Sequence, residues 1–273
     1  MDEFAKLSVQ ERSFYFEKTA SEKNFNILVV EKDFWVCWVI KRLFSMPELS
    51  AHLTFKGGTS LSKAFGIIRR FSEDIDITIN RSFFGFVGEK DPADKSREKR
   101  EKLLDELRGV VRIYIQGDLL KKLSEEFARQ LGSKKSWKLY PDSEDPDQQS
   151  LVFEYHTEQT EKSGYLRSAI KIEFGARGED WPSETCRLKS FVAEVIPDAM
   201  KTPHQDVQVL SPRRTFWEKA TILHSYYYWP ETKEIPSRQS RHYYDLFCLL
   251  KSSVAFEVAK EPELLEKVAD HKK

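Results

Sequence analysis

The most constraining feature of the sequence is the segment at residues 55–79, where a glycine turn, an apolar-periodic helix and an alternating strand follow one another. The strand carries two carboxylates between three isoleucines. Because side chains alternate between the faces of a strand, Asp74 and Asp76 project to one side while Ile75, Ile77 and Ile79 point into a core. The segment therefore predicts two neighbouring acids on the open face of a half-buried strand.

Two such acids repel each other unless a cation lies between them or one of them stays protonated. Magnesium is the fitting cation, because carboxylates and substrate phosphates are its usual ligands. The preceding turn offers backbone N–H groups at a helix start, where anions are favoured; it consists of Gly57, Gly58, Thr59 and Ser60. Each element alone is common, but a phosphate site followed by a metal site indicates chemistry on a nucleotide.

This order and spacing resemble the nucleotidyltransferase fold of the DNA polymerase beta type. Residues 70–76, RFSEDID, after residues 56–61, KGGTSL, resemble more narrowly the AbiEii/AbiGii family of nucleotidyltransferase toxins. Three further stretches match that family in order. Residues 31–35 (EKDFW) resemble its N-terminal helix, and Ser211-Pro212 with residues 216–220 (FWEKA) resemble its lysine motif. Residues 241–246 (RHYYDL) resemble its closing motif. The stretch at about 81–165 diverges.

The resemblance implies an α+β fold with two lobes, in which helices flank a small mixed sheet and a helical lobe follows. We place the nucleotidyltransferase core lobe at residues 1–210 and the C-terminal helical lobe at 211–273. Family members continue past a His-Lys element like the one at the end of this chain, so we expect the second lobe to be shortened. A charged helical insertion at about 91–131 is interpreted as a solvated face with i,i+4 ion pairs, a docking arm being the alternative.

Periodicity gives a coarse secondary structure. Helices are predicted at 8–46 with one turn, at about 91–131, at 213–228 and at about 240–251. Strands are predicted at 53–55, 73–80, 151–156, 167–174 and 207–210, and an acidic loop at 140–150. The helix after the glycine turn should bury Leu61, Phe65 and Ile68, with Thr59 or Ser60 as its cap.

A third carboxylate is predicted on the strand at 169–174, where the apolar residues face one way and Lys171 and Glu173 the other. The resemblance implies that this strand lies beside the aspartate strand. Asp74 and Asp76 would then hold two Mg²⁺ (or Mn²⁺) ions, and Glu173 would ligate the catalytic ion or accept the acceptor's proton. Without the other motifs, a surface ion pair between Lys171 and Glu173 is an equal interpretation.

The family motifs also imply roles for four residues outside these strands. Lys219 should reach the triphosphate and neutralise charge on the leaving group, the alternative being a surface lysine paired with Glu218 or another neighbour. Arg241 and Asp245 share a helical face and could form a bracing ion pair, or Asp245 could belong to the active site. Arg70 could contact phosphate or anchor the aspartate strand.

Composition limits the class of protein. Lys and Arg together number 44, as do Asp and Glu, so a net charge of zero argues against a chain that coats nucleic acid by bulk charge. The three cysteines lie far apart and are typical of buried thiols in a reducing compartment. The longest apolar run, residues 34–40, is too short to span a membrane, and the N-terminus lacks a signal-peptide pattern. We therefore expect a soluble, cytoplasmic protein.

The leading hypothesis is a metal-dependent nucleotidyltransferase that transfers NMP from an NTP to an acceptor, as the toxin of a toxin–antitoxin or abortive-infection pair. The resemblance implies the tRNA 3′ end as acceptor and a cognate antitoxin as partner. Residues 226–229 (YYYW), followed by Lys233, Arg238 and Arg241, interleave aromatics and cations as RNA contacts do. Two alternatives remain: transfer to a protein hydroxyl, and a non-catalytic module that binds nucleotide or RNA.

Overall fold

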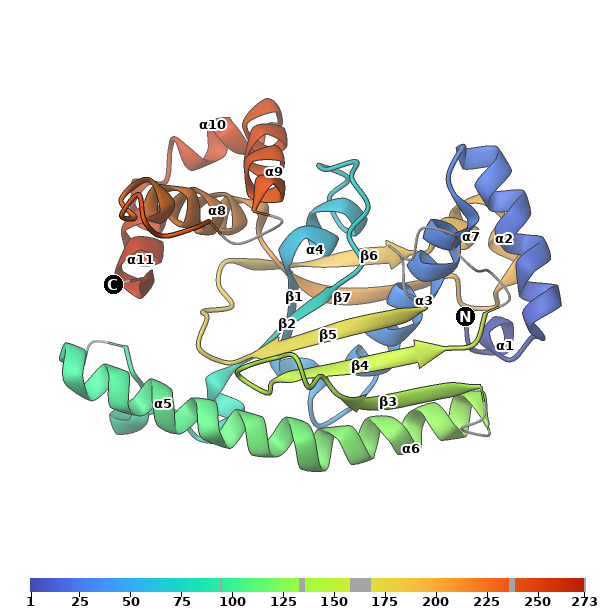
Figure 1. Cartoon of the computed structure of the whole chain (residues 1–273), viewed down its shortest axis with the longest axis horizontal. Helices are drawn as coiled ribbons and strands as arrows, with labels where there is room; N and C mark the ends of the chain where they lie inside the picture. The colour runs from blue at the N-terminus through green and yellow to red at the C-terminus, as the bar shows by residue number, and fades with distance from the viewer. Residues whose placement is uncertain (94, 133–135, 158–167, 236–238, 273) are drawn as a thin grey trace.

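A computed structural model describes residues 1–93, 95–132, 136–157, 168–235 and 239–272 of the chain. A single mixed sheet of seven strands runs through it in the order β3-β4-β5-β2-β1-β7-β6 (Figure 1). The strands are β1 (Leu53–Lys56), β2 (Ile75–Ile79), β3 (Trp137–Pro141), β4 (Ser150–Tyr155), β5 (Ala169–Gly175), β6 (Ser183–Lys189) and β7 (His204–Leu210). The α+β class predicted from the sequence is confirmed.

Helices surround the sheet and continue past it at the C-terminal end of the chain (Figure 1). The N-terminal group is α1 (Asp2–Ala5), α2 (Val9–Lys23) and α3 (Ile27–Phe44), joined later in the chain by α7 (Phe191–Val195). The short α4 (Gly57–Lys63) links β1 to the segment before β2. The C-terminal group is α8 (Pro212–Tyr227), α9 (Ser240–Lys251), α10 (Val254–Val258) and α11 (Pro262–Lys272).

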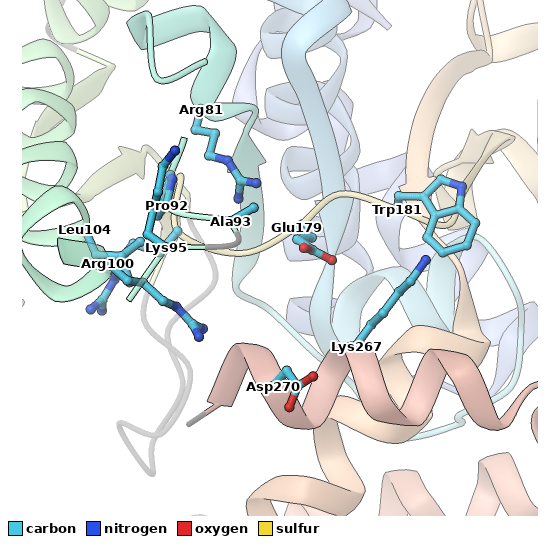
Figure 2. A pocket seen from close by; sticks show the side chains of 11 residues that line it. Arg81, Pro92, Ala93, Lys95, Arg100, Leu104, Glu179, Trp181, Lys267 and Asp270 are labelled. Atoms are coloured by element: carbon cyan, nitrogen blue, oxygen red, sulfur yellow. The ribbon is translucent and has the colours of Figure 1, made fainter. Parts of the chain in front are cut away.

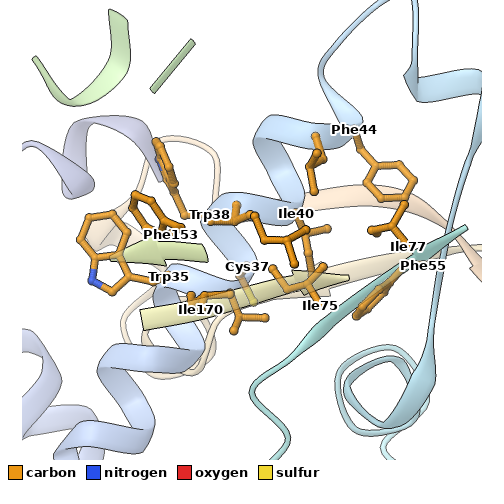
Figure 3. Packing of buried hydrophobic residues seen from close by; sticks show 14 of the residues in the cluster. Trp35, Cys37, Trp38, Ile40, Phe44, Phe55, Ile75, Ile77, Phe153 and Ile170 are labelled. Carbon is orange, nitrogen blue, oxygen red and sulfur yellow. The ribbon is translucent and has the colours of Figure 1, made fainter. Parts of the chain in front are cut away.

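The core lies between the sheet and α3. Ile75, Ile77 and Ile79 of β2 are fully buried, as the alternating pattern predicts. They belong to one apolar cluster with Trp35 and Trp38 of α3 (Figure 3). Burial of this face leaves the opposite face of β2 free for its polar side chains.

A second apolar cluster holds the C-terminal helices to α4. It joins Leu61 and Ile68 to Phe216 of α8 and Leu249 of α9, with Val254 and Val258 of α10. The helices after residue 210 thus pack on the segment that carries the glycine turn. Among the described residues, no helix is long and apolar enough to cross a membrane.

The predicted charged helix forms along one side of the sheet as α5 (Arg97–Tyr114) and α6 (Leu120–Leu131), joined by a π-helical turn at Ile115–Leu119. Its buried apolar residues recur every four positions: Leu103, Leu107, Val111, Ile115, Leu119, Leu123 and Phe127. Because an α-helix has about 3.6 residues per turn, such a stripe drifts around the helix. The wider π turn, which contains Gly117, brings the stripe back toward the core.

Several predicted elements were wrong or absent. The helix after the glycine turn ends at Lys63 instead of reaching Ile68, because Gly66 adopts a left-handed backbone with φ +63° and the chain turns there. Strands β3 and β6 were not predicted, since they are mostly polar edge strands with little alternation, and β3 takes in the start of the predicted loop at 140–150. Helices α10 and α11 were also missed.

Candidate active site

Three acidic residues meet where β2 and β5 run side by side. The strands are parallel, and Asp76 of β2 lies directly opposite Glu173 of β5. Asp74 precedes β2 by one residue, and on the alternating pattern it shares the face of Asp76. Neighbouring strands are about 4.8 Å apart, so the pairing brings together the carboxylates predicted from the sequence. The prediction that β5 lies beside the aspartate strand is confirmed by this register.

The glycine turn folds over Asp76. Lys56 of β1 pairs with Asp76 across an antiparallel ladder, and Gly57 follows at once with a φ of +80°. A Cβ on Gly57 would lie 1.9 Å from Oδ2 of Asp76, and one on Gly58 would lie 2.6 Å from Nη2 of Arg70. Only glycine allows so close an approach of backbone to these side chains.

Substitution of Gly57 by Ala should therefore disturb the site as well as the backbone. A residue with a Cβ at positive φ costs about 1 kcal/mol or more, and the added methyl must also displace Asp76. Gly66→Ala provides the control, because Gly66 has a φ of +63° but a Cβ added there would meet nothing within 4 Å. We expect both variants to lower the midpoint of urea unfolding, with the larger loss for Gly57→Ala. Equal losses would show that the contact with Asp76 carries no energy.

The hydroxyls of the turn do not cap α4. Lys56 occupies the N-cap position of the helix and makes no side-chain cap. Thr59 Oγ1 lies 2.5 Å from the carbonyl oxygen of Asp74, while Ser60 Oγ donates to the carbonyl oxygen of Gly57 at 2.9 Å. The cap predicted for Thr59 or Ser60 was wrong. The Thr59 hydroxyl instead bonds to the aspartate segment, and the Ser60 hydroxyl bonds within the turn.

Burial and neighbouring charges raise the pKa of both aspartates of the site. Burial, the charge of Glu173 and a hydrogen bond with it raise the pKa of Asp76 to about 7, although Lys56 opposes the change. Burial also raises the pKa of Asp74, helped by the charges of Glu173 and Glu73 and opposed by that of Arg241. Two neighbouring aspartates with raised pKa values have an unmet demand for positive charge.

The three carboxylates supply the oxygen donors that magnesium prefers. Within the described ranges, no cluster of three or more His, Cys, Asp or Glu side chains is already arranged to hold a metal ion. Glu173 Oε1 lies 2.9 Å from Nζ of Lys171, on the same face of β5. Lys171 also reaches Asp142 at 3.2 Å. The donor set fits a divalent cation once Glu173 exchanges this ion pair for the metal.

Arg70, Lys219 and Asp245 form an ionic cluster beside the acids, in which Lys219 and Asp245 are buried and Arg70 is partly exposed. Arg70 Nε and Nη2 each donate to a different oxygen of Asp245 at 2.7 Å. Lys219 Nζ lies 2.9 Å from Oδ2 of the same carboxylate, which is completely buried. Burial alone would raise the pKa of Asp245, but the hydrogen bond from Arg70 and the charge of Lys219 leave it below its ordinary value. Arg70 and Lys219, for which contacts with phosphate were predicted, thus share the carboxylate of Asp245 as their partner.

Arg241 and His242 extend this cluster toward the acids. Arg241 Nη1 lies 3.8 Å from Oδ2 of Asp74, so it faces the acids instead of bracing Asp245 on its own helix. His242 Nδ1 lies 3.5 Å from Nζ of Lys219. Burial and the charges of Lys219 and Arg241 lower the pKa of His242 to about 4, so its ring is neutral near pH 7.

Buried charged residues of α3 contact the segments that carry the site, and these contacts were not predicted from the sequence. Lys32 pairs with Glu73, the neighbour of Asp74. Asp33 pairs with Lys63 of α4 at 2.7 Å and accepts a hydrogen bond from the backbone N–H of Phe191. The motif at residues 31–35 pointed to this helix, but only the fold shows that its charges position both α4 and the aspartate segment.

The predicted RNA-contacting segment is partly described. Tyr227 and Tyr228 are exposed, and Lys233 Nζ lies 3.5 Å from the ring centre of Trp229. Arg238 falls outside the described residues. A contact between this segment and RNA stays a prediction.

A known protein family matches most of the length of this chain. The model of the family described as "Nucleotidyl transferase AbiEii toxin, Type IV TA system" matches residues 38–273. The chain belongs to this family. Among solved structures, it is similar to MenT4, a nucleotidyltransferase toxin from Mycobacterium tuberculosis H37Rv, with 19% identity and a TM-score of 0.39 over 72% of this chain and 52% of that one. It thus spans about half the length of that toxin, and no curated protein matches it.

Membership of the AbiEii family confirms the resemblance that the motifs indicated. The matched range includes the glycine turn, all three acids and the helices that carry Lys219 and Asp245. A nucleotidyltransferase toxin of a toxin–antitoxin system is the function that the family carries. The roles of single residues, the metal and the acceptor stay predictions.

Proposed function

We propose that this AbiEii family member transfers NMP from an NTP to a hydroxyl at the 3′ end of tRNA, in the cytoplasm, and that a cognate antitoxin restrains it. The observation that carries the proposal is the pairing of Asp76 with Glu173 under the turn at Gly57. In the reaction, the acceptor oxygen forms a bond to the α-phosphorus and the bond to pyrophosphate breaks.

The three acids and the basic cluster would have different roles in the reaction. Asp74, Asp76 and Glu173 would hold two Mg²⁺ (or Mn²⁺) ions, which when bound activate the attacking hydroxyl and stabilise the leaving group. Glu173 would either ligate the catalytic ion or accept the acceptor's proton. The N–H groups of the turn at Gly57, Gly58, Thr59 and Ser60 would bind phosphate oxygens.

The cations near Asp245 would bind the rest of the triphosphate. Lys219 is held at 2.9 Å from Asp245, so its ammonium group is oriented before the nucleotide arrives. Arg241, at 3.8 Å from Asp74, is in a loose pair that a phosphate could replace. Arg70 makes two hydrogen bonds to Asp245 and would act mainly by fixing that carboxylate.

Incubation of the protein with each α-labelled NTP, Mg²⁺ and total cellular tRNA tests this proposal directly. We expect label on tRNA from one preferred NTP, and loss of that label when EDTA is added or when Asp74→Ala/Asp76→Ala replaces the wild-type protein. Label on protein with none on RNA would assign a protein hydroxyl as acceptor. Calorimetric NTP binding without transfer to any acceptor would make the chain a binding module and would overturn the proposal.

A further inference from the structure

A second basic site lies at the far end of the strands that carry the acids. A cleft of about 530 Å³ is bounded by the residues after β2, the residues after β5, the start of α5, and α11 (Figure 2). Five of its lining residues are cationic, namely Arg81, Lys95, Arg100, Arg177 and Lys267. Two are acidic, Glu179 and Asp270, and Glu179 pairs with Arg214 at 3.1 Å. In a chain with no net charge, this concentration of positive charge is a local feature.

An exposed indole lies in the wall of the same cleft. Trp181 is 57% exposed, and Nζ of Lys267 lies 4.7 Å from its ring centre. Figure 2 shows Trp181 and Lys267 on one side of the cleft, with Lys95 and Arg100 on the other. An accessible aromatic ring among cations is the arrangement that binds single-stranded nucleic acid, because bases stack on the ring and cations hold the phosphates.

The position of the cleft favours the acceptor, and not the nucleotide, as its ligand. The turn at Gly57, Arg70 and Lys219 lie around the start of β2, whereas Arg81 follows its end. β2 ends at Ile79, three residues after Asp76, and β5 ends at Gly175, two residues after Glu173. At about 3.3 Å per residue within a strand, the two acids lie about 10 Å and about 7 Å from those strand ends, and Arg81 and Arg177 follow just beyond them. In-line displacement places the attacking and leaving oxygens on opposite sides of the phosphorus. An acceptor that approaches from this end of the strands would therefore not compete for space with a triphosphate bound at the start of β2.

We propose that this cleft binds the single-stranded 3′ end of an RNA acceptor, with a base stacked on Trp181 and the backbone phosphates held by Arg177, Lys267 and their neighbours. The inference rests on the proposed transfer to RNA and adds where that RNA lies. Two of these arginines already form ion pairs, since Arg177 lies 3.7 Å from Asp147 and Arg81 lies 2.9 Å from Asp91. Partly exposed pairs of this kind are weak, so RNA phosphates could replace the carboxylates.

Fluorescence anisotropy with the full chain tests the cleft without NTP, in EDTA. The probes are a labelled RNA hairpin with a single-stranded 3′ overhang and the same hairpin with a blunt end. The variant Arg177→Gln/Lys267→Gln should bind the overhang probe about tenfold more weakly and lower the slope of log affinity against log salt by about 1.4, or about 0.7 per lost contact. The matched control Lys18→Gln/Lys121→Gln removes the same charge from exposed positions outside the cleft and should bind within about twofold of wild type.

Stacking is tested at Trp181 alone. We expect Trp181→Ala to weaken binding at least about fivefold, and Trp181→Phe, which keeps a ring, to restore most of it. The inference is overturned if both double variants weaken binding equally, or if wild type binds blunt and overhang probes alike. It is also overturned if the cleft variants raise KM for NTP instead of KM for RNA.

The same assays separate this inference from the proposed function. Wild-type protein that binds the overhang probe through the cleft but transfers no nucleotide to RNA would contradict the proposed function and leave the binding site standing. Transfer to RNA with an unchanged KM for RNA in the cleft variants would contradict the cleft alone.

Discussion

Asp76→Asn is expected to abolish nucleotide transfer while making the metal-free protein more stable. The loss of transfer follows because the amide removes a charged oxygen ligand from the centre of the acid group, and effects of this kind on transition-state charge are about a thousandfold. The measurement is the rate at which label from α-labelled NTP reaches tRNA. A rate close to that of wild type would remove Asp76 from the mechanism.

The gain in stability follows from the raised pKa of Asp76. In the unfolded chain the carboxyl ionises near pH 3.8, but in the folded chain it keeps its proton up to about pH 7. As pH rises from 4 to 7, the unfolded chain ionises this group while the folded chain keeps its proton, so the free energy of unfolding falls, and above pH 7 the penalty is complete. Asparagine does not ionise, so the variant escapes the penalty, which is about 4 kcal/mol for a pKa raised from 3.8 to about 7 at about 1.4 kcal/mol per unit.

Unfolding by urea in EDTA at pH 5, 6, 7 and 8 measures this effect. The free energy of unfolding of Asp76→Asn should exceed that of wild type by a margin that widens from pH 5 to 7 and then levels off. Addition of Mg²⁺ should raise the stability of wild type and leave the variant almost unchanged. A constant margin at all four pH values would show that Asp76 is not held in its protonated form by its neighbours.

The central part of the fold followed from the sequence because local pattern and burial agree there. The alternation at residues 75–79 fixed which face of β2 is buried, and the acids then had to occupy the other face. Glu173 could be predicted in the same way, from alternation on its own strand. By contrast, β3 and β6 are edge strands, where polar residues face solvent on more than one side and the pattern weakens.

The partners of the charged side chains could not be predicted from spacing. Arg241 and Asp245 are four residues apart on α9, yet Asp245 contacts Arg70 and Lys219 from other elements while Arg241 faces Asp74. By contrast, Lys171 and Glu173 share a face of β5 and do form the ion pair that was the alternative interpretation from their spacing. Which charged residues pair depends on which elements pack together, and the local sequence does not contain that information.

Asp245→Ala is expected to destabilise the protein by about 3 kcal/mol, because it leaves the buried Lys219 and the partly exposed Arg70 without their carboxylate. Arg70 would lose two hydrogen bonds of 2.7 Å and Lys219 its contact of 2.9 Å. Asp206→Ala is the matched control, since Asp206 also pairs with an arginine, Arg187, at 3.0 Å but is 52% exposed. Water and salt screen an exposed pair of this kind, so the control should change the free energy of unfolding little.

The pH dependence distinguishes the charge of Asp245 from its packing. Because the pKa of Asp245 is lowered in the folded state, its ionised form contributes stability above the unfolded value near 3.8, and this contribution is lost as pH falls through the folded value. Asp245→Asn keeps the shape and removes only the charge, so its deficit in the free energy of unfolding should be full at pH 7 and shrink below pH 4. A deficit that stays constant down to pH 3 would mean that packing, and not the attraction to Arg70 and Lys219, makes this carboxylate necessary. If the charge is what matters, the same residue that stabilises the fold also holds Lys219 ready beside the acids, and the variant should show a raised KM for NTP at pH 7.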